Sequence, residues 1–447
     1  MLITWLTFGF CSFPSPNSFE YRAIDPCSEG RYVLLVNVRS SKTSHPRTRR
    51  AKDTAHLRRG RGGYEAPCPH YPHCIGCPFI NVPYPEQLVQ KQKIVAQALS
   101  NYSSLLHVRV PAVNASPYRL GYRARVKLVV RSSRGEVATG LYVPETHRVI
   151  DISSCPVHPR PVNQVTGYLK RKILELKIAP YDERNDSGQL RYLDFQYSFA
   201  RRELHLTLVT RHVEFPQGTA LARSLSRRFS FVTGVIQNIN EKRDNVIWGD
   251  RYRLLAGRDT LLEEIGSLKF AFPAGVFSQA NPAAAKKLYE TVAVMADLSG
   301  SENVLDLYCG VGPTSLYLAR TARVVWGIDE SSLSVDTAKQ NARRNGFSNC
   351  RFLAGDVGEK IAEAHRTLGR VDSIVLNPPR KGVQPAAMEA ILAVNAPRII
   401  YVSCEPNSLS RDLDKLVNRG YRILQLQPFD MFPQTKQVEN VALLKKN

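Results

Sequence analysis

The stretch VLDLYCGVGPTS, residues 304–315, decides the fold of this chain. An apolar run typical of a buried strand is followed by a glycine turn and by residues that open a helix. Gly310 and Gly312 let the backbone turn sharply and approach a ligand closely. Such a turn is a weak signal alone, because nicotinamide and flavin enzymes use related turns. The residues that follow the turn therefore have to show which class of enzyme it belongs to.

The chain from Lys269 onward alternates between strand-like and helix-like runs. This alternation predicts an α/β domain with a Rossmann-like, doubly wound and mostly parallel sheet. Asp329 ends the second predicted strand, about 17 residues after Gly312, where a carboxylate typically accepts hydrogen bonds from ribose hydroxyls. The next two strands are followed by Asp356 and Asn377.

The glycine turn reads GVGPTS and lacks the GxGxxG pattern preferred by dinucleotide enzymes. A glycine turn, an acid after strand two, a polar residue after strand three and Asn-Pro-Pro after strand four resemble an S-adenosylmethionine-dependent methyltransferase. The alternative is that these residues only cap helices. Several matches at successive strand ends favour the methyltransferase interpretation.

The chain has 447 residues and a formal net charge of +22. Its length exceeds one compact core, so we expect two or three domains. A strongly basic surface attracts polyanions such as nucleic acid, although charge also serves simply to keep a protein soluble. The apolar opening MLITWLTFGFCSF lacks the features of a secretory signal, and no run is long enough to span a membrane. We expect a cytoplasmic protein without a membrane partner, and a monomer by default.

The chain divides into three parts. Residues 1–62 form a basic segment that is predicted to be flexible, with residues 39–62 acting either as a phosphate-binding arm or as an inert linker. Residues 63–265 hold strand-like runs such as RARVKLVVRS and ELHLTLVTR, which predict an antiparallel sheet with helical insertions such as PEQLVQKQKIVAQALSNY. Residues 266–447 form the α/β domain.

Cys404 follows the strand-like run RIIYV and opens the polar loop SCEPNSLSRDL. This is the carboxyl edge of the predicted sheet, where open α/β sheets bind their ligands. A lone cysteine at a strand end is more often a small packing residue. A following helix, with Arg380 and Lys381 on a neighbouring strand end, would instead favour a reactive thiolate. Glu439 would bring a carboxylate to the same edge from the C-terminal segment.

Five motifs in order, VFSQANP, LDLYCGVG, NPPRKG, YVSCEPNSLSRDL and FDMFPQTKQVE, resemble the bacterial RNA uracil-5 methyltransferase family. The resemblance covers the chain from about Cys68 to the C-terminus. It implies that Cys404 is the nucleophile and Glu439 the base. It also implies a pocket for S-adenosylmethionine lined by Gln279, Tyr308, Asp329, Asp356 and Asn377.

The chemistry of this family explains the need for a thiol. Carbon 5 of uracil is too poor a nucleophile to attack a sulfonium methyl group directly. Addition of a thiolate to carbon 6 creates an enolate with electron density at carbon 5, and after methylation a base must remove the proton from carbon 5. A nucleophile, a base and a methyl donor are therefore the minimum set, and this sequence has candidates for all three.

Three positions depart from the family pattern. Asn377 stands where many members have Asp, although a branch resembling the enzymes for a second site in large-subunit ribosomal RNA also carries Asn. Gln437 replaces a common His. Glu405 follows the cysteine where Asn is usual, and a negative charge beside a thiol is expected to raise its pKa.

The motif CPHYPHCIGC places Cys68, Cys74 and Cys77 in a C-x5-C-x2-C pattern, and Cys155 follows in DISSCPVHP. Four thiolates hold either a structural zinc ion or an iron–sulfur cluster, and the spacing leaves both open. The resemblance favours a 4Fe–4S cluster, which the ribosomal-RNA branches carry on this pattern. We expect it to be structural because the methylation needs no electron. Nearby histidines are expected to lie outside the ligand set: His70, His73 and His158.

The run YRLGYRARVK interleaves tyrosine with arginine. Such side chains stack on unpaired bases and bind phosphates, although they are also typical of a solvated strand face. Arg123, Arg125 and Lys127 would share one face of a regular strand. The target uracil must leave any stack to reach Cys404, so we expect a single-stranded or loop substrate with a flipped base.

The sequence thus predicts an enzyme that makes 5-methyluridine in RNA. The cysteine motif indicates 23S ribosomal RNA as the substrate, because the transfer-RNA branch of the family generally lacks it. Three alternatives stay open. The first is a transfer-RNA uracil-5 methyltransferase. The second methylates the exocyclic amine of another nucleobase through Asn377-Pro378-Pro379 and leaves Cys404 idle, and the third is a non-catalytic RNA-binding factor.

Overall fold

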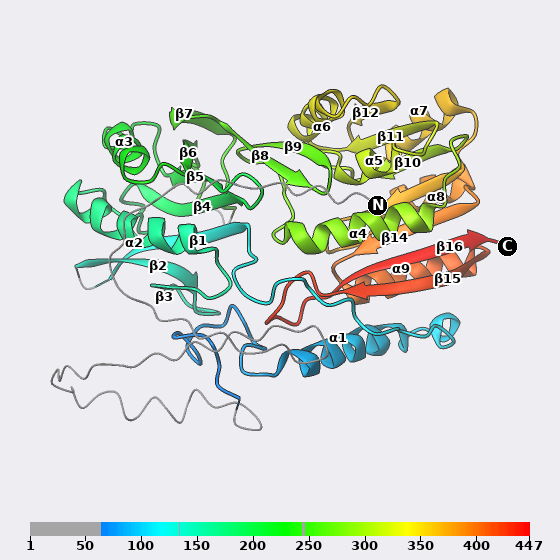
Figure 1. Cartoon of the computed structure of the whole chain (residues 1–447), viewed down its shortest axis with the longest axis horizontal. Coiled ribbons are helices and arrows are strands. Elements are labelled where there is room, and N and C mark those ends of the chain that lie inside the picture. Colours follow the sequence, from blue (N-terminus) through cyan, green and yellow to red (C-terminus); the bar gives the residue numbers. More distant parts are fainter. Residues whose placement is uncertain (1–63, 134, 244–245) are drawn as a thin grey trace, which may run out of the picture. The chain divides into compact units, whose positions relative to one another are not determined.

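The C-terminal part of the chain is built round a seven-stranded sheet with the order β12-β11-β10-β13-β14-β16-β15. Figure 1 shows this sheet within the whole structure. The structure is a computed structural model, and it describes residues 64–133, 135–243 and 246–447. The predicted basic segment 1–62 lies outside the described residues. The strands are β10 (Asn303–Leu307), β11 (Val324–Asp329), β12 (Cys350–Ala354), β13 (Ser373–Leu376), β14 (Arg398–Ser403), β15 (Tyr421–Phe429) and β16 (Glu439–Lys446).

Helices alternate with the first five of these strands, which pair in parallel. This confirms the predicted Rossmann-like, doubly wound α/β domain. β16 departs from the pattern and pairs antiparallel with both β14 and β15. β15 and β16 are joined by residues 430–438 alone, which is too short for a crossover helix, so the two strands must run in opposite directions. The helices are α4 (Pro282–Ala296), α5 (Pro313–Leu318), α6 (Ser332–Arg344), α7 (Val357–Leu368), α8 (Pro385–Val394) and α9 (Pro406–Asn418).

β10 lies where the strand order reverses, between β11 and β13. All of its residues are buried, and its last residue, Leu307, is aligned with Ile328 and with Leu376. The carboxyl ends of these three strands therefore meet at one edge of the sheet. Open α/β sheets bind their ligands at such a switch point.

A second seven-stranded sheet precedes this domain, with the order β3-β2-β1-β4-β5-β6-β7. Most of its neighbouring strands are antiparallel as predicted, but β5 and β6 are parallel because a helix, α3, connects them. Helix α2 covers the sheet with Val162, Val165, Leu169 and Ile173, which follow one helical face. The elements are β1 (Arg125–Ser133), β2 (Glu136–Tyr142), β3 (Val149–Asp151), α2 (Arg160–Glu175), β4 (Leu190–Ser198), β5 (Glu203–Thr210), α3 (Gly218–Arg228), β6 (Val232–Ile239) and β7 (Arg251–Gly257).

A hairpin of β8 (Thr260–Ile265) and β9 (Leu268–Pro273) follows the second sheet. The predicted domain boundary between residues 265 and 266 falls in the turn of this hairpin. β8 lies against β4, whereas Phe270 and Phe272 of β9 join the core of the C-terminal sheet. The hairpin therefore packs on both parts of the chain.

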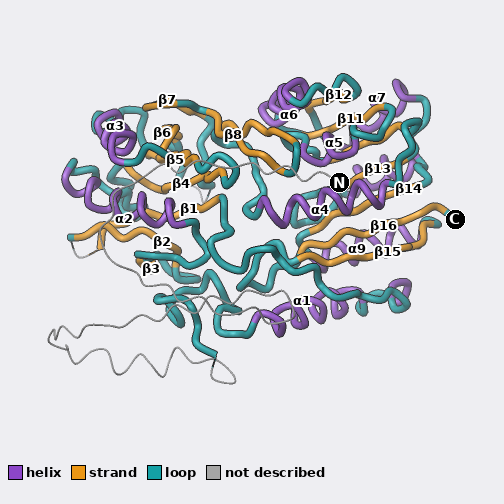
Figure 2. Tube along the Cα trace, viewed as in Figure 1, coloured by secondary structure: helices purple, strands orange, loops and turns teal. Residues whose placement is uncertain are grey.

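Helix α1 (Tyr84–Leu99) coincides with the predicted helical insertion. It lies in the region predicted as the central domain, yet it packs against α9 of the C-terminal sheet. Val95 and Leu99 share a hydrophobic core with Leu409 and Leu413. After the short 3-10 helix η2 (Ser103–Leu105), the chain runs as a loop to β1 (Figure 2). Among the helices of the described residues, none is long and apolar enough to cross a membrane.

Candidate active site

Four of the five residues predicted to bind the methyl donor lie at the carboxyl edge of the C-terminal sheet. Tyr308 directly follows β10 and Asp329 is the last residue of β11. Asp356 follows β12 by two residues and caps the amino end of α7, and Asn377 directly follows β13. The parallel strands explain this meeting, because their carboxyl ends lie at the same edge of the sheet.

The glycine turn after β10 is held by Asp329. One carboxylate oxygen accepts a hydrogen bond from the Gly310 backbone N–H at 2.9 Å, and the other accepts one from Ser331 N–H at 3.0 Å. Gly310 and Gly312 have φ angles of +55° and +86°, in the left-handed region that favours glycine. Each carboxylate oxygen has a second lone pair, so Asp329 still has acceptor capacity for ribose hydroxyls.

Tyr308 stands between the glycine turn and the strand end. Its φ of +63° is unusual for a large side chain, and such backbone conformations cluster at functional sites. Burial raises the pKa of Tyr308 to about 12, and the carboxylate of Asp356 adds to the shift. The backbone N–H of Asn377 donates to Leu307 at 3.2 Å, which ties the ends of β13 and β10 together. Carboxylates, a phenol and an amide at one edge suit the polar groups of S-adenosylmethionine.

Gln279, the fifth predicted donor-binding residue, lies in the loop between β9 and α4. It lines a small cavity together with Gln196 of β4 and Glu263 of β8. The structure thus places it beside the hairpin of β8 and β9, whereas the other four lie at or just after strand ends.

Cys404 and Glu439 lie opposite each other on neighbouring strands. In the antiparallel pairing of β14 with β16, Ser403 is aligned with Asn440. The next residue along β14 is Cys404, and the preceding residue of β16 is Glu439, so the same register sets these two side by side. β14 is the neighbour of β13, and the predicted nucleophile and base therefore adjoin the edge that carries Asn377.

The pKa values of both groups are raised. Burial raises the pKa of Cys404 to about 11, and the charge of Glu439 adds to this rise. Glu439 is only 4% exposed, and burial raises its pKa to about 7. Arg380 opposes both shifts, through its charge on each group and through a hydrogen bond to the thiol. A carboxyl that titrates near neutrality is well suited to accept a proton during a reaction.

Glu405 has a different role from the one that its place in the sequence suggests. Its side chain caps the amino end of α9, where it accepts hydrogen bonds from the backbone N–H and the side-chain amide of Asn407 at 3.4 and 3.2 Å. The charged groups that shift the pKa of Cys404 are Glu439 and Arg380. The negatively charged neighbour of the thiol is therefore Glu439 and not Glu405. Strand pairing brings Glu439 there from 35 residues further along the chain.

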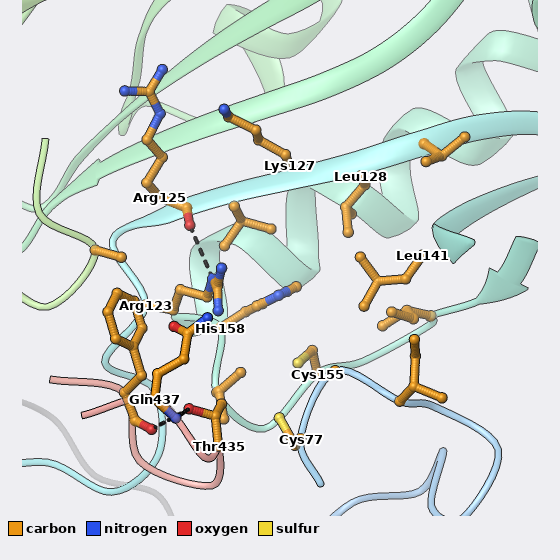
Figure 3. A pocket seen from close by; sticks show the side chains of 18 of the residues that line it. Cys77, Arg123, Arg125, Lys127, Leu128, Leu141, Cys155, His158, Thr435 and Gln437 are labelled. Carbon is orange, nitrogen blue, oxygen red and sulfur yellow. Dashed lines mark hydrogen bonds between the residues drawn. The ribbon is translucent and has the colours of Figure 1, made fainter. Parts of the chain in front are cut away.

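A groove of about 1150 Å³ extends from the region of Arg380 to the predicted cysteine motif. Figure 3 shows its lining, with Thr435 and Gln437 from the loop before β16 and Arg125 and Lys127 from β1. Its walls combine basic, aromatic and apolar side chains. Such a lining is typical of a groove that holds single-stranded nucleic acid.

Arg125 and Lys127 share one face of β1, as predicted, and both lie over the ring of Trp248, at 5.5 and 5.1 Å from its centroid. Arg125 is buried, unlike a residue of a solvated strand face, and it forms an ion pair with Asp194 at 3.2 Å. Arg123 precedes the strand and lies over the ring of Phe432 at 5.9 Å. Trp248 was not predicted as part of this surface, and its signal in the sequence is an aromatic residue within the polar, basic run NEKRDNVIWGDRYR.

The four cysteines of the predicted cluster come together, although Cys155 is far from the others in sequence. Burial, together with the charges of the other three thiolates, raises the pKa of Cys77 to about 12. Backbone N–H groups point at two of the sulfurs, from Gly76 to Cys74 and from Val157 and His158 to Cys155. Hydrogen bonds of this kind are typical of metal-bound thiolates.

No group of three or more His, Cys, Asp or Glu side chains in the described residues is arranged closely enough to hold a metal ion. A single tetrahedral ion draws its four sulfurs within about 2.3 Å of itself. A cuboidal iron–sulfur cluster keeps its four thiolates farther apart, since each binds a different iron atom. These four cysteines form no disulfide bonds. His70 bonds to Ser154 at 3.0 Å instead of pointing into the group.

The chain is similar to a known family and to known proteins. The model of the family described as tRNA (Uracil-5-)-methyltransferase matches residues 83–447. An uncharacterized RNA methyltransferase of Geobacter sulfurreducens is 40% identical over 379 residues, which cover 85% of this chain and 77% of that protein. An uncharacterized RNA methyltransferase of Halalkalibacterium halodurans is 38% identical, with 85% of this chain and 83% of that protein covered.

A solved structure is also similar to this chain. The tRNA (uracil-54, C5)-methyltransferase of Pyrococcus abyssi, in complex with S-adenosyl-L-homocysteine, matches with a TM-score of 0.68 and 26% sequence identity. The match covers 83% of this chain and 86% of the Pyrococcus protein. S-adenosyl-L-homocysteine is what remains of S-adenosylmethionine after its methyl group has been transferred.

Proposed function

The chain belongs to the RNA uracil-5 methyltransferase family, and on that premise we propose that it methylates carbon 5 of a uridine in 23S ribosomal RNA through a transient bond to Cys404. It is an S-adenosylmethionine-dependent enzyme that acts on RNA. The choice of ribosomal RNA and the covalent step are our proposals. The covalent step is supported above all by the register that sets Cys404 opposite Glu439 at the edge beside Asn377.

The thiol of Cys404 gives up its proton to solvent, the resulting thiolate bonds to carbon 6 of the uracil, and the electrons of the ring double bond move toward carbon 5. When bound, S-adenosylmethionine supplies the methyl group that carbon 5 takes up. Glu439 then accepts the proton from carbon 5. The electrons of that C–H bond restore the ring double bond, and the bond between carbon 6 and sulfur breaks to return the thiolate of Cys404.

The free enzyme holds Cys404 as a neutral thiol, because its pKa of about 11 lies well above neutrality. Arg380 and the amino end of α9 both favour the thiolate and so assist the attack. Glu439 has a pKa of about 7, so a large share of the molecules carry it as a carboxylate at neutral pH. Only that form accepts a proton.

The test is methyl transfer from labelled donor to unmodified RNA, followed by nucleoside analysis. We expect 5-methyluridine from the native enzyme and none from Cys404→Ala. Cys350→Ala is a matched control, since Cys350 is a thiol of the same sheet but begins β12 at the opposite edge. Full activity without Cys404, or a methylated amine as the product, would favour the alternative in which Asn377-Pro378-Pro379 orients an exocyclic amine. RNA binding without any methyl transfer would contradict the proposal.

Methylation of transfer RNA is the second candidate function, and the likeness to the Pyrococcus abyssi enzyme favours it. The cysteine motif favours ribosomal RNA. Labelled methyl transfer to equal concentrations of 23S ribosomal RNA and bulk transfer RNA, both from unmodified transcripts, distinguishes the two. We expect label in the ribosomal RNA. Label in the transfer RNA alone would replace our proposal with this second function.

We also propose that Cys68, Cys74, Cys77 and Cys155 hold a 4Fe–4S cluster that fixes the N-terminal sheet against the chain before α1. The gathered thiols and the N–H groups that point at Cys74 and Cys155 support this. Anaerobic purification should give a brown protein with about four iron atoms per chain. Stoichiometric zinc, or no metal, would contradict the proposal.

The organisation of the chain leads to two further proposals. Residues 63–265 bind RNA along the groove next to β1, and the basic segment 1–62 adds contacts to phosphates. The protein acts as a monomer in the cytoplasm. RNA binding should weaken steeply as salt rises, and light scattering of the free protein should give the mass of a single chain.

A further inference from the structure

The loop of residues 430–438 joins β15 to β16 and leads directly into Glu439. Loops usually run over the surface, but Asp430, Met431 and Gln434 of this loop are 1%, 0% and 3% exposed. A buried loop must find partners for its backbone groups inside the protein. The partners of this loop therefore decide where it lies.

Successive carbonyl groups of the loop are bound by four separate parts of the chain. Gln434 has a φ of +72°, a strained conformation that persists only where the surroundings hold it. The loop is thus fixed from several sides at once. The four bonds run from Asn281 to Met431 at 3.1 Å, from Lys91 to Phe432 at 2.9 Å, from Tyr122 to Pro433 at 2.9 Å and from Phe79 to Gln434 at 2.9 Å.

Helix α1 presents a buried polar face to this loop. Tyr84, Gln87 and Lys91 follow one side of the helix, and they are 6%, 0% and 0% exposed. Lys91 bonds to Asp430 at 2.5 Å, and the Tyr84 hydroxyl donates to the other oxygen of Asp430 at 2.8 Å. Gln87 and Gln434 exchange two hydrogen bonds, at 2.8 and 3.0 Å.

A buried ion pair of this kind is a poor source of stability. Removing two charges from water costs about as much as their attraction returns, and apolar replacements of such pairs are often neutral or stabilising. The pair of Lys91 and Asp430 therefore needs another explanation. Its geometry supplies one, since a single ammonium group fixes both a side chain and a backbone carbonyl at the start of the loop.

We propose that Lys91 is a positioning residue for the methylation reaction: through Asp430 and the carbonyl of Phe432 it fixes the loop that leads into Glu439 at the point where strand pairing places this residue opposite Cys404. The proposal rests on the proposed function, because it assigns Lys91 to the step in which Glu439 removes the proton from carbon 5. Bond formation by Cys404 depends less on Lys91, because β14 and α9 hold Cys404 in place independently of the loop. Loss of Lys91 therefore delays release of the methylated uracil from Cys404.

The test uses Lys91→Met and the double variant Lys91→Met, Asp430→Asn. The single variant leaves a buried carboxylate without its partner and is expected to lower the melting temperature. The double variant leaves no unpaired charge and should melt close to the native protein. Phe432 still lacks its donor there, so we expect turnover to fall about 100-fold, as for other misplacements of about 1 Å. The KM for S-adenosylmethionine should stay within twofold.

The distinguishing readout is protein trapped on ordinary uridine RNA. In the double variant, denaturing electrophoresis should show a methylated protein–RNA adduct that the native enzyme does not accumulate. Lys93→Met is the matched control, because Lys93 is an exposed lysine of the same helix, and it should behave as the native enzyme. If the double variant does not fold, Tyr84→Phe removes the other anchor of Asp430 without changing a charge. It should give the same adduct to a smaller extent.

Native turnover in the folded double variant would overturn the proposal, and so would slow turnover without an adduct. These results differ from a failure of the proposed function. In that case the native enzyme itself would not bond to RNA that carries 5-fluorouridine, whatever residue stands at position 91.

Discussion

Cys404 and Cys77 are both partly buried thiols, and their neighbours give them different chemistry. Burial raises the pKa of Cys404 to about 11 and that of Cys77 to about 12. The charged groups round Cys404 are Glu439 and Arg380, one able to accept a proton and the other able to stabilise a thiolate. The groups round Cys77 include three further thiols. The comparison teaches that neighbours, more than burial, distinguish the role of nucleophile that we propose for Cys404 from the role of metal ligand that we propose for Cys77.

The largest effect that would sharpen this comparison is expected from Cys404→Ala. Without a sulfur at this position carbon 5 cannot be activated, and methylation should fall on the order of 10⁴-fold or more. Single-turnover assays with labelled S-adenosylmethionine measure the loss. Cys350→Ala should keep native activity, and an equal loss in that control would show that the effect comes from folding instead.

Glu439→Gln should have the next largest effect. An amide cannot accept the proton from carbon 5, so overall turnover should fall about 10²- to 10⁴-fold while bond formation by Cys404 continues. Methylated adduct should therefore accumulate on uridine RNA, as gel electrophoresis would reveal. A variant that turns over normally would remove Glu439 from the mechanism and leave Cys404 without a base.

Arg380→Gln should give a smaller effect, of roughly tenfold in turnover. Arg380 holds the pKa of Cys404 below the value that burial and Glu439 alone would set, so its loss should raise that pKa further above about 11. The pH dependence of alkylation of Cys404 measures the shift. Lys381→Gln is the control, since this exposed neighbour is not among the groups that shift the pKa of Cys404.

The last expected effect concerns stability instead of turnover. The pKa of Glu439 is raised from 4.5 to about 7 on folding, so the folded state binds the proton more tightly than the unfolded state. The stability that this proton contributes is present below about pH 4.5 and is lost as the pH rises through about 7. Glu439→Gln should thus be more stable than the native protein at pH 8, by on the order of 3 kcal/mol. Urea unfolding at pH 5 and pH 8 checks this, and an equal difference at both pH values would contradict the burial of a titrating carboxyl.

Local sequence patterns were enough to predict much of the fold and the location of the candidate site. The alternation of strands and helices after Lys269 predicted the parallel sheet, because each element has its own periodicity. Asp329, Asp356 and Asn377 were expected at one edge because a parallel sheet brings its strand ends together, and they lie there. Cys404 also directly follows its strand as expected, and the roles of these residues stay predictions.

What the sequence did not reveal depends on pairing between distant segments. Lys91 and Asp430 are 339 residues apart, and a lysine on an otherwise ordinary helix gives no sign that it is buried. The packing of α1 on α9 was missed for the same reason. The parallel pair of β5 and β6 was missed because strand-like runs do not reveal the direction in which they pair.

Glu405 illustrates the limit most clearly. Adjacency in sequence suggested that its charge would act on Cys404, but the backbone turns its side chain toward the end of α9. Strand pairing brings Glu439 to the thiol instead. Neighbours along the chain were therefore a poor guide to neighbours in space at the position that matters most for the chemistry.

The central claim is that the sulfur of Cys404, and none of the clustered thiols, bonds to the uracil ring. The most direct measurement is peptide mapping by mass spectrometry of the native enzyme after reaction with S-adenosylmethionine and RNA that contains 5-fluorouridine, from which the fluorine cannot be removed as a proton is. The account predicts one modified peptide, which contains Cys404 and carries a methylated fluorouracil. Modification at Cys68, Cys74, Cys77 or Cys155, or methylation of RNA by an enzyme that forms no adduct, would contradict it.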